Sequence, residues 1–354
     1  MRRRLLFGLA LLTLITGQYR GATKPAAAVG TEAGPRTVRI ATATPSGVYY
    51  LMGQAIARLW NQQLTGVTAS VVTTGGTPEN IDLLDRREAE VAFAQDGVVY
   101  YALRGMGPFQ GRAAGAGLRG LTHFYPNVMQ VMVRKKAGIR SLTDLQGTAG
   151  SGGAQGTGGP QAGQGLQRRR IVLGPPNSAT EINSREILGV HNIDLNTRTD
   201  LISESMGYGE AADALAAGRA DVAVIAGGLP TPAVASGLES GEVQLIGLEE
   251  KKIAALIRRS PWYYPYVIPK GTYPGQAEDI RTVAVSNILV ARADLPDELV
   301  YQMVKALYEN RERLASVHPA ARDLEPREAL QGITGVVELH PGAARYLSEI
   351  GVLR

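Results

Sequence analysis

The stretches VRIATATPSGV at residues 38–48 and RIVLGPPNSA at residues 170–179 decide the fold. Each runs in the same order: a strand rich in β-branched residues, a turn with proline and serine, then the apolar spacing of a helix. Backbone N–H groups at such a helix start point out of the carboxyl end of the strand. Open α/β sheets bind ligands there, and the helix start favours anions. The two stretches therefore predict matched anion-binding joints on two similar lobes that face each other across a cleft.

Length and composition describe a globular protein. The chain has 354 residues, 44% hydrophobic and 19% charged, which is enough apolar surface for two lobes with cores of their own. The formal net charge of +5 includes three arginines at positions 2–4. Because no Lys/Arg tract alternates with aromatic residues, nucleic acid is not an expected partner.

The first residues resemble a secretory signal peptide. Arginines at 2–4 precede an apolar stretch from Leu5 to Ile15, and small residues at 26–28 are suited to cleavage. The alternative is a membrane anchor, but the stretch is short for a span. The chain has no Cys, which excludes disulfides, thiolate metal sites and lipid attachment through Cys. We therefore expect a signal peptide at 1–28 and a mature protein in the bacterial periplasm.

Strands and helices are predicted to alternate through the rest of the chain, which favours a parallel, doubly wound sheet. Ser46 and Thr77 are placed to cap the first two helices, and Thr231 precedes a third with Pro232 at its first position. Lobe I is predicted over 36–130 and 268–354, and lobe II over 131–267. The Gly-rich run 148–165 is a predicted flexible insertion. Further strands are expected at 69–74, 91–95, 129–133, 221–226, 243–247 and 282–285, and helices at 179–188, 208–217 and beyond 297.

Glycines precede two other predicted helix starts. Thr74-Gly75-Gly76-Thr77 and Gly227-Gly228-Leu229-Pro230 allow backbone N–H groups to approach a ligand closely. The alternative is ordinary turn chemistry. No Gly-Lys-Ser/Thr follows, and the spacing is not the dinucleotide fingerprint, so neither phosphate motif is indicated.

Ser178-Ala179-Thr180-Glu181 fits a capping box, in which the serine oxygen accepts the N–H of Glu181. The alternative is that the box only starts a helix. Asn177 and Thr180 add polar groups suited to a carboxylate.

Side-chain contacts to a ligand are expected from Tyr49, in the first turn of a helix, and Gln95, at a strand end. Core packing and an ordinary strand end are the alternatives, and core packing is favoured for Tyr125. The four histidines lack metal-ligand spacing, and no Gly-x-Ser-x-Gly elbow is present. Neither catalytic residues, metal nor cofactor is predicted, and the chain is not expected to be an enzyme.

Several segments together resemble the TAXI-type solute receptors of TRAP transporters, over Ile40 to Gly351. The segments that carry the resemblance are 40–50, 74–80, 271–276 and 340–343 with Tyr346 and Glu349. The chain departs from the family pattern at Val48 and Ala179, where glycine is usual. The added Cβ at Ala179 narrows the approach to its helix start.

The resemblance implies an α/β, two-lobe periplasmic binding protein-like fold that closes on an organic acid, an amino acid or a dicarboxylate such as glutamate. It implies delivery to membrane-embedded TRAP permease subunits driven by an ion gradient, and we expect a monomer. The alternatives are a receptor of another uptake or sensing system, or a secreted α/β enzyme. The predicted ligand-binding residues are Ser46, Gly47, Tyr49, Thr74, Gly75, Gly76, Asn80, Gln95, Asn177, Ser178, Thr180, Gly227, Gly228 and Pro230.

Overall fold

The computed structural model describes residues 36–112, 114–148 and 168–353. The predicted signal peptide and residues 149–165 of the predicted insertion lie outside this range. The strands are β1 (Arg36–Ala41), β2 (Val67–Val72), β3 (Val91–Gln95), β4 (Leu118–Arg134), β5 (Arg169–Val172), β6 (Leu201–Glu204), β7 (Val222–Gly227), β8 (Val243–Ile246), β9 (Tyr264–Ile268) and β10 (Ile280–Arg292). The α-helices are α1 (Val48–Gln63), α2 (Thr77–Asp85), α3 (Asp96–Arg104), α4 (Ala179–Val190), α5 (Tyr208–Ala216), α6 (Pro232–Glu239), α7 (Glu250–Arg259), α8 (Asp297–Glu309), α9 (Arg311–Val317) and α10 (Pro341–Glu349), with 3₁₀ turns at Gly107–Phe109, Lys135–Ala137, Leu142–Thr148, Pro319–Asp323 and Pro326–Glu328.

The strands follow the order β2-β1-β3-β10-β4-β7-β5-β6, with β8 paired to β4 and β9 to β10. The trio β2-β1-β3 is parallel, and so is the trio β6-β5-β7. Each trio is bordered by a long antiparallel strand, β10 beside β3 and β4 beside β7. The two halves therefore repeat one arrangement, which confirms the predicted α/β, two-lobe fold. The expectation of a parallel sheet is wrong in part, because β10 and β4 run antiparallel to their neighbours and the sheet is mixed.

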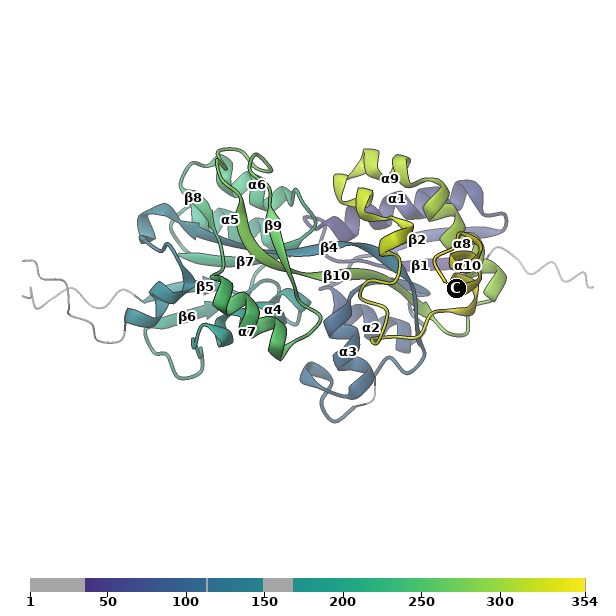
Figure 1. The fold of residues 1–354 in the computed structure, drawn as a ribbon, viewed down its shortest axis with the longest axis horizontal. Coiled ribbons are helices and arrows are strands. Elements are labelled where there is room, and N and C mark those ends of the chain that lie inside the picture. Colours follow the sequence, from purple (N-terminus) through teal and green to yellow (C-terminus); the bar gives the residue numbers. More distant parts are fainter. Residues whose placement is uncertain (1–35, 113, 149–167, 354) are drawn as a thin grey trace, which may run out of the picture. The chain divides into compact units, whose positions relative to one another are not determined.

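Two long strands connect the halves. β4 pairs with β10 over Leu118–Val128 and then with β7 over Val128–Val133, so it passes from one trio to the other. Figure 1 shows β4 and β10 running between the part that holds β1 and β2 and the part that holds β5 to β8. Within these two long strands the sequence predicted only the shorter strands 129–133 and 282–285. We propose the predicted lobe boundaries with one change. Because Ile268 and Tyr273 pack with lobe II residues, the boundary predicted at residue 268 moves into β10.

The helix starts correct two predicted caps. α1 begins at Val48 as expected, but Gly47 is its N-cap, and Ser46 makes no capping hydrogen bond. α2 begins at Thr77 itself because Gly76, at φ 115°, is the N-cap. That conformation is accessible to glycine, so the chain enters the helix one residue early. The Thr77 hydroxyl oxygen instead accepts the N–H of Gln95 at 3.1 Å.

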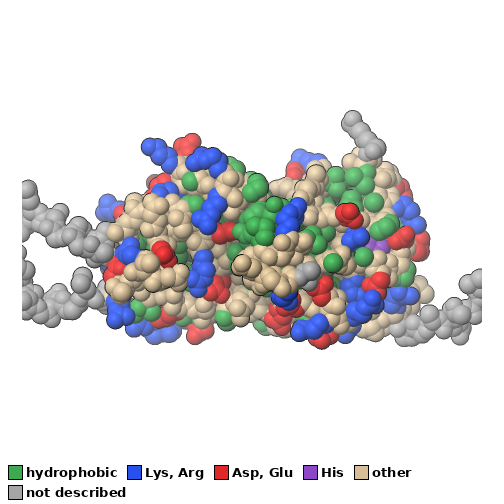
Figure 2. All heavy atoms as spheres, turned by 90° about the horizontal axis from the view of Figure 1, so that it is seen from below, with side chains coloured by type: hydrophobic (Ala, Val, Ile, Leu, Met, Phe, Trp, Pro, Cys, Tyr) green, Lys and Arg blue, Asp and Glu red, His purple; other side chains and the backbone are tan. Residues whose placement is uncertain are grey.

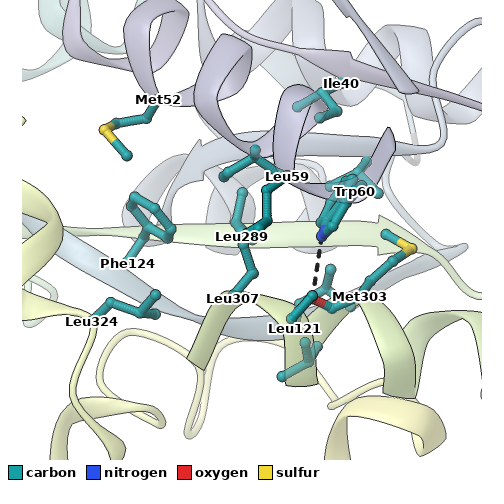
Figure 3. Close-up of a cluster of buried hydrophobic side chains, with 14 of the residues drawn as sticks. Ile40, Met52, Leu59, Trp60, Leu121, Phe124, Leu289, Met303, Leu307 and Leu324 are labelled. Carbon is teal, nitrogen blue, oxygen red and sulfur yellow. Dashed lines mark hydrogen bonds between the residues drawn. The ribbon is translucent and has the colours of Figure 1, made fainter. Parts of the chain in front are cut away.

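Lobe I is held together by a core that joins segments far apart in the sequence. Figure 3 shows Trp60 of α1 facing Met303 and Leu307 of α8 across β-strand residues. The Trp60 indole N–H donates to the Met303 carbonyl at 3.2 Å, so its polar atom is paired although the ring is fully buried. Removing such a ring typically costs about 3–5 kcal/mol. The predicted helical stretch beyond residue 297 thus belongs to the core around the first helix.

Candidate functional site

A small buried pocket of about 40 Å³ lies at the carboxyl ends of the parallel strands of both trios. This is the edge at which α/β sheets bind ligands. From lobe I the pocket is lined by Ala43, Thr44, Gly47, Val48, Tyr49, Gly75, Gly76, Thr77, Gln95, Tyr125 and Asn127, and from lobe II by Pro175, Ser178, Ala179, Thr180, Tyr208, Ala226 and Gly227.

The first turn of α2 presents backbone N–H groups to this pocket. The first bond of the helix runs from the Asn80 N–H to the Gly76 carbonyl at 3.0 Å, so earlier N–H groups have no partner within the helix. The Gly75 N–H donates to Glu79 Oε2 at 2.7 Å and the Gly76 N–H to Thr74 Oγ1 at 3.0 Å. The N–H groups of Thr77 and Glu79 remain for a ligand.

The first turn of α4 meets the same pocket from lobe II. Ser178 Oγ accepts the Glu181 N–H at 3.1 Å, which confirms the predicted cap. The predicted return contact differs by one residue, since Glu181 Oε2 accepts the N–H of Asn177 at 2.9 Å. The N–H groups of Ala179 and Thr180 lie before the first helical bond, which reaches the Ser178 carbonyl from Ile182. With the start of α1 at Gly47 to Tyr49, three helix starts line one pocket.

Tyrosine side chains form much of the remaining wall. The Tyr49 hydroxyl donates to Asn287 Oδ1, and its ring stacks on Phe93 at 4.9 Å between centroids. The Tyr208 hydroxyl donates to the Ala226 carbonyl at 2.8 Å and also contacts Thr180 Oγ1. Burial raises the pKa of Tyr208 to about 12 and raises the pKa of Tyr49 further. Both phenols therefore stay protonated and neutral at physiological pH.

Three polar side chains of the lining lack partners. Gln95, Tyr125 and Asn127 are 3%, 1% and 4% exposed. Among the described residues, the side-chain polar atoms of these three make no hydrogen bond that would satisfy them. Their polar atoms are not among the fully buried unpaired atoms of the described residues, so they are accessible from the pocket and can bind a ligand there.

The lining carries no full charge: none of its described residues is Lys, Arg, His, Asp or Glu. Asp96 comes directly after Gln95 but does not line the pocket. Its Oδ1 accepts the Gly97 N–H at 2.7 Å, so the start of α3 is occupied by the chain's own acid. Burial raises the pKa of Asp96 to about 8, which keeps it largely protonated at pH 7. Figure 2 shows Lys/Arg and Asp/Glu side chains interspersed over the face it presents.

Eight of the predicted ligand-binding residues lie in this lining. They come from five separate loops or strand ends, which the fold brings together around one cavity. The eight are Gly47, Tyr49, Gly75, Gly76, Gln95, Ser178, Thr180 and Gly227.

The other six lie behind the lining and shape it. Asn80 Nδ2 donates to the carbonyls of Thr42 and Phe93, each at 2.8 Å, and Thr74 Oγ1 reaches the Thr42 carbonyl at 3.0 Å. These bonds fasten the loop before α2 to β1 and β3. Ser46 Oγ lies 3.5 Å from Thr44 Oγ1.

In lobe II the residues outside the lining act through the backbone or through close packing. Asn177, at φ 56°, turns the chain ahead of α4. A Cβ at Gly228 would lie 2.8 Å from Ala320 and 3.0 Å from the Tyr125 ring, so only glycine fits there. The Pro230 carbonyl is 3.1 Å from His318 Nε2.

Sequence reasoning missed Asn127 and Tyr208 as lining residues, and it favoured core packing for Tyr125, which lines the pocket as well. Asn127 is one of several buried polar residues of β4, with Thr122, His123 and Gln130, so no sequence signal set it apart. Tyr208 opens α5 directly after β6, so it obeys the same strand-end rule as the residues that were found. Pro175 and Ala226 carry no comparable signal, because small and apolar residues at strand ends are ordinary.

A second set of contacts joins the lobes beside the pocket. The Tyr101 hydroxyl donates to Glu186 Oε1 at 2.5 Å, and the Tyr263 hydroxyl donates to Glu186 Oε2 at 2.6 Å. The Trp262 ring packs between Tyr100 and Tyr101 and leaves no room for a Cβ at Gly97. Burial raises the pKa of Glu186, while the two phenols and the positive charge of Arg259 oppose the shift. These contacts link α3 of lobe I to α4 and the segment before β9 of lobe II.

The described residues offer no recognisable catalytic or metal constellation around the pocket. The four histidines lie outside the lining, and no group of three or more potential ligands that could hold a metal occurs in ranges 36–112, 114–148 and 168–353. Over the same part of the chain, no helix has the length and apolar character needed to cross a membrane.

A comparison with models of protein families identifies the family of this chain. The model of the NMT1-like family matches residues 40–165 and 162–351, which is most of the sequence. The chain belongs to the NMT1-like family. The matched range includes every residue that lines the pocket.

Solved structures with the same fold include MatC from Rhodopseudomonas palustris with bound malate. It is 13% identical, with a TM-score of 0.54, and the match covers 89% of this chain and 96% of MatC. The alkanesulfonate-binding protein SsuA from Xanthomonas axonopodis pv. citri, bound to MOPS, is 15% identical with a TM-score of 0.47 over 89% and 84%. A TctC solute binding protein from Polaromonas is 13% identical with a TM-score of 0.47 over 90% and 99%. At these identities the likeness to MatC shows the fold.

Proposed function

We propose that this chain is a periplasmic solute receptor that captures a small organic acid in the pocket and delivers it to a membrane permease. The observation that carries the proposal is the meeting of three helix starts, from both lobes, on one buried cavity. First-turn N–H groups favour an anion, and a ligand held by both lobes stabilises the closed form. A permease that recognises the closed form would then receive only loaded receptor.

The magnitudes are consistent with useful affinity. A micromolar Kd corresponds to about 8 kcal/mol. Helix dipoles contribute about 0.3–1 kcal/mol each, so they are too weak alone. Hydrogen bonds to a charged group contribute about 1.5–3 kcal/mol each. We propose that hydrogen bonds from the open N–H groups at the starts of α2 and α4, with those at the start of α1, supply most of the binding energy.

The family match and the MatC fold, whose structure holds malate, support a receptor rather than an enzyme. The resemblance to TAXI-type receptors favours a TRAP permease as the partner and an amino acid or dicarboxylate such as glutamate as the ligand. We propose the TRAP permease on that ground, together with a monomeric receptor exported by its signal peptide.

A thermal-shift titration of the mature protein tests the receptor function. Because a ligand that binds only the native state raises the Tm with its concentration, a matching acid should raise it progressively. A panel of monocarboxylates, dicarboxylates, amino acids and 2-oxoacids covers the candidates, and calorimetry then gives the Kd. If no acid raises the Tm and none gives heat of binding, the receptor function is wrong.

Delivery is tested separately with the purified permease of the same gene neighbourhood reconstituted in vesicles. Labelled acid should accumulate only when receptor and an ion gradient are both present. Accumulation that requires ATP instead would contradict the TRAP assignment and leave the receptor function intact.

A further inference from the structure

We infer that the pocket selects a short monocarboxylic acid that carries a neutral hydrogen-bonding group, such as a hydroxyl or oxo group, and rejects a second charge. This inference rests on the proposed receptor function and narrows its ligand class. It differs from the dicarboxylate and amino acid ligands that the family resemblance suggests.

The first argument is charge. The described lining residues supply no cation to pair with a second carboxylate and no acid to pair with an ammonium group. Burying an unpaired charge is strongly unfavourable. One carboxylate is provided for by the facing starts of α2 and α4, where Gly76 and Ser178 approach so closely that a Cβ on Gly76 would be 4.0 Å from that of Ser178.

The second argument is the field around that anion position. Glu79 Oε2 lies 2.7 Å from the Gly75 nitrogen, and Glu181 Oε2 lies 2.9 Å from the Asn177 nitrogen. Gly75 lines the pocket, and Asn177 directly precedes the lining residue Ser178. They already add negative potential at the pocket, which further disfavours a dianion.

The third argument is the unpaired polar group of Gln95, Tyr125 and Asn127. The two amides offer both donors and acceptors, and the Tyr125 phenol is neutral because burial raises its pKa well above the usual value. A hydroxyl or oxo group on the ligand satisfies such atoms without bringing a charge. A plain alkyl acid would leave them unpaired, which is costly in a buried site.

The fourth argument is size. The cavity, at about 40 Å³, is small. The pocket therefore fits an acid with a short carbon chain better than a long or bulky one.

The test is calorimetry with four acids of one carbon-chain length: butyrate, 2-hydroxybutyrate, 2-aminobutyrate and succinate, at one pH and ionic strength. We expect 2-hydroxybutyrate to bind most tightly. Butyrate should be roughly tenfold weaker, the loss of about one hydrogen bond. Succinate and 2-aminobutyrate should be weaker by roughly 100-fold, because each buries an unpaired charge.

Tyr125→Phe locates the discrimination. It removes only the unpaired hydroxyl, so the fold should survive, and the preference for 2-hydroxybutyrate over butyrate should shrink by roughly threefold to tenfold. Tyr308→Phe is the matched control, since its buried hydroxyl pairs with Thr122 Oγ1 away from the pocket and should leave the preference unchanged. Asn127→Leu is the second variant and should shrink the same preference.

The outcomes separate this inference from the proposed function. Tightest binding of succinate or 2-aminobutyrate overturns the inference and leaves an acid receptor. Equal binding of butyrate and 2-hydroxybutyrate, or an unchanged preference in both Tyr125→Phe and Asn127→Leu, also overturns it. If neither these four acids nor any acid of the wider panel binds, both the inference and the proposed receptor function are wrong.

Discussion

The β2–α2 joint and the β5–α4 joint face one pocket and share one device. In each, a glutamate in the first turn accepts the N–H of the residue four positions earlier, Glu79 from Gly75 and Glu181 from Asn177. They differ at the N-cap. Ser178 caps α4 with its hydroxyl, whereas Gly76 leaves α2 without a side-chain cap.

Because of this difference, we expect one joint to serve mainly ligand binding and the other mainly the stability of its helix. At α4 the serine satisfies the third N–H, so the helix start is stable before a ligand arrives. At α2 the third N–H, on Glu79, stays open, and the loop is held by the backbone conformation of Gly76. The start of α3 is a third case, closed by its own acid, Asp96. We therefore expect α2 to contribute more to affinity and α4 more to stability.

Gly76→Ala should have the largest effect on binding. A Cβ there meets only open space and the Ser178 side chain at 4.0 Å, but φ 115° is strained for alanine. Such strain costs about 1–3 kcal/mol, so the loop should shift and the affinity should fall roughly 10-fold to 100-fold. Calorimetry with the tightest acid checks this.

Gly66→Ala is the matched control. Gly66 has φ 72° with no atom within 4 Å of the added Cβ and lies outside the pocket lining. It should lower the free energy of unfolding by about 1 kcal/mol and leave the Kd unchanged. Equal Kd values for the two variants would break the proposed role of the α2 start.

Asp96→Asn tests whether a protonated acid closes the start of α3. Burial raises the pKa of Asp96 in the folded state from its ordinary value of 3.8 to about 8, so between these pH values only the folded state holds the proton. The contribution of Asp96 to stability is therefore full below pH 4 and lost as the pH rises towards 8, at up to about 1.4 kcal/mol per pH unit. The asparagine variant should lack this slope.

Urea unfolding of both proteins between pH 5 and 8 measures it, because titrations of all other groups cancel in the difference. A difference that stays constant across this range would show that Asp96 is ionised in the folded protein.

Ser178→Ala should have a smaller, two-part effect. Loss of the cap should lower the free energy of unfolding by about 1 kcal/mol. Loss of a hydroxyl that lines the pocket should weaken binding by roughly threefold to tenfold. Ser316→Ala, on an exposed serine that bonds only its own helix, controls for both readouts. An unchanged Kd would remove Ser178 from the anion site.

The sequence predicted the joints because their signals are local. Proline, serine and glycine after a strand indicate the start of a helix. Because the carboxyl ends of parallel strands lie at one edge of a sheet, these helix starts are expected at that edge. It could not place the N-cap at Gly76, since that depends on Thr77 turning its hydroxyl to the Gln95 N–H, a contact between two elements. Asn127 was missed for a similar reason. Its amide has no hydrogen-bond partner among the described residues, and only the folded structure shows that it lines the pocket.

Glu79→Gln and Glu181→Gln should give the smallest effects and the sharpest comparison. Glutamine keeps an acceptor for the backbone N–H and removes a negative charge beside the anion position, so binding should strengthen slightly. The positive charge of Arg185 already offsets the negative charge of Glu181, because Arg185 Nη2 lies 2.8 Å from Glu181 Oε1. Glu79→Gln should therefore improve affinity by roughly twofold and Glu181→Gln by less, with both gains shrinking as salt rises. Calorimetry at two ionic strengths measures this. Weaker binding in Glu79→Gln at both salts would mean that the geometry of the loop, and not its charge, governs the α2 start.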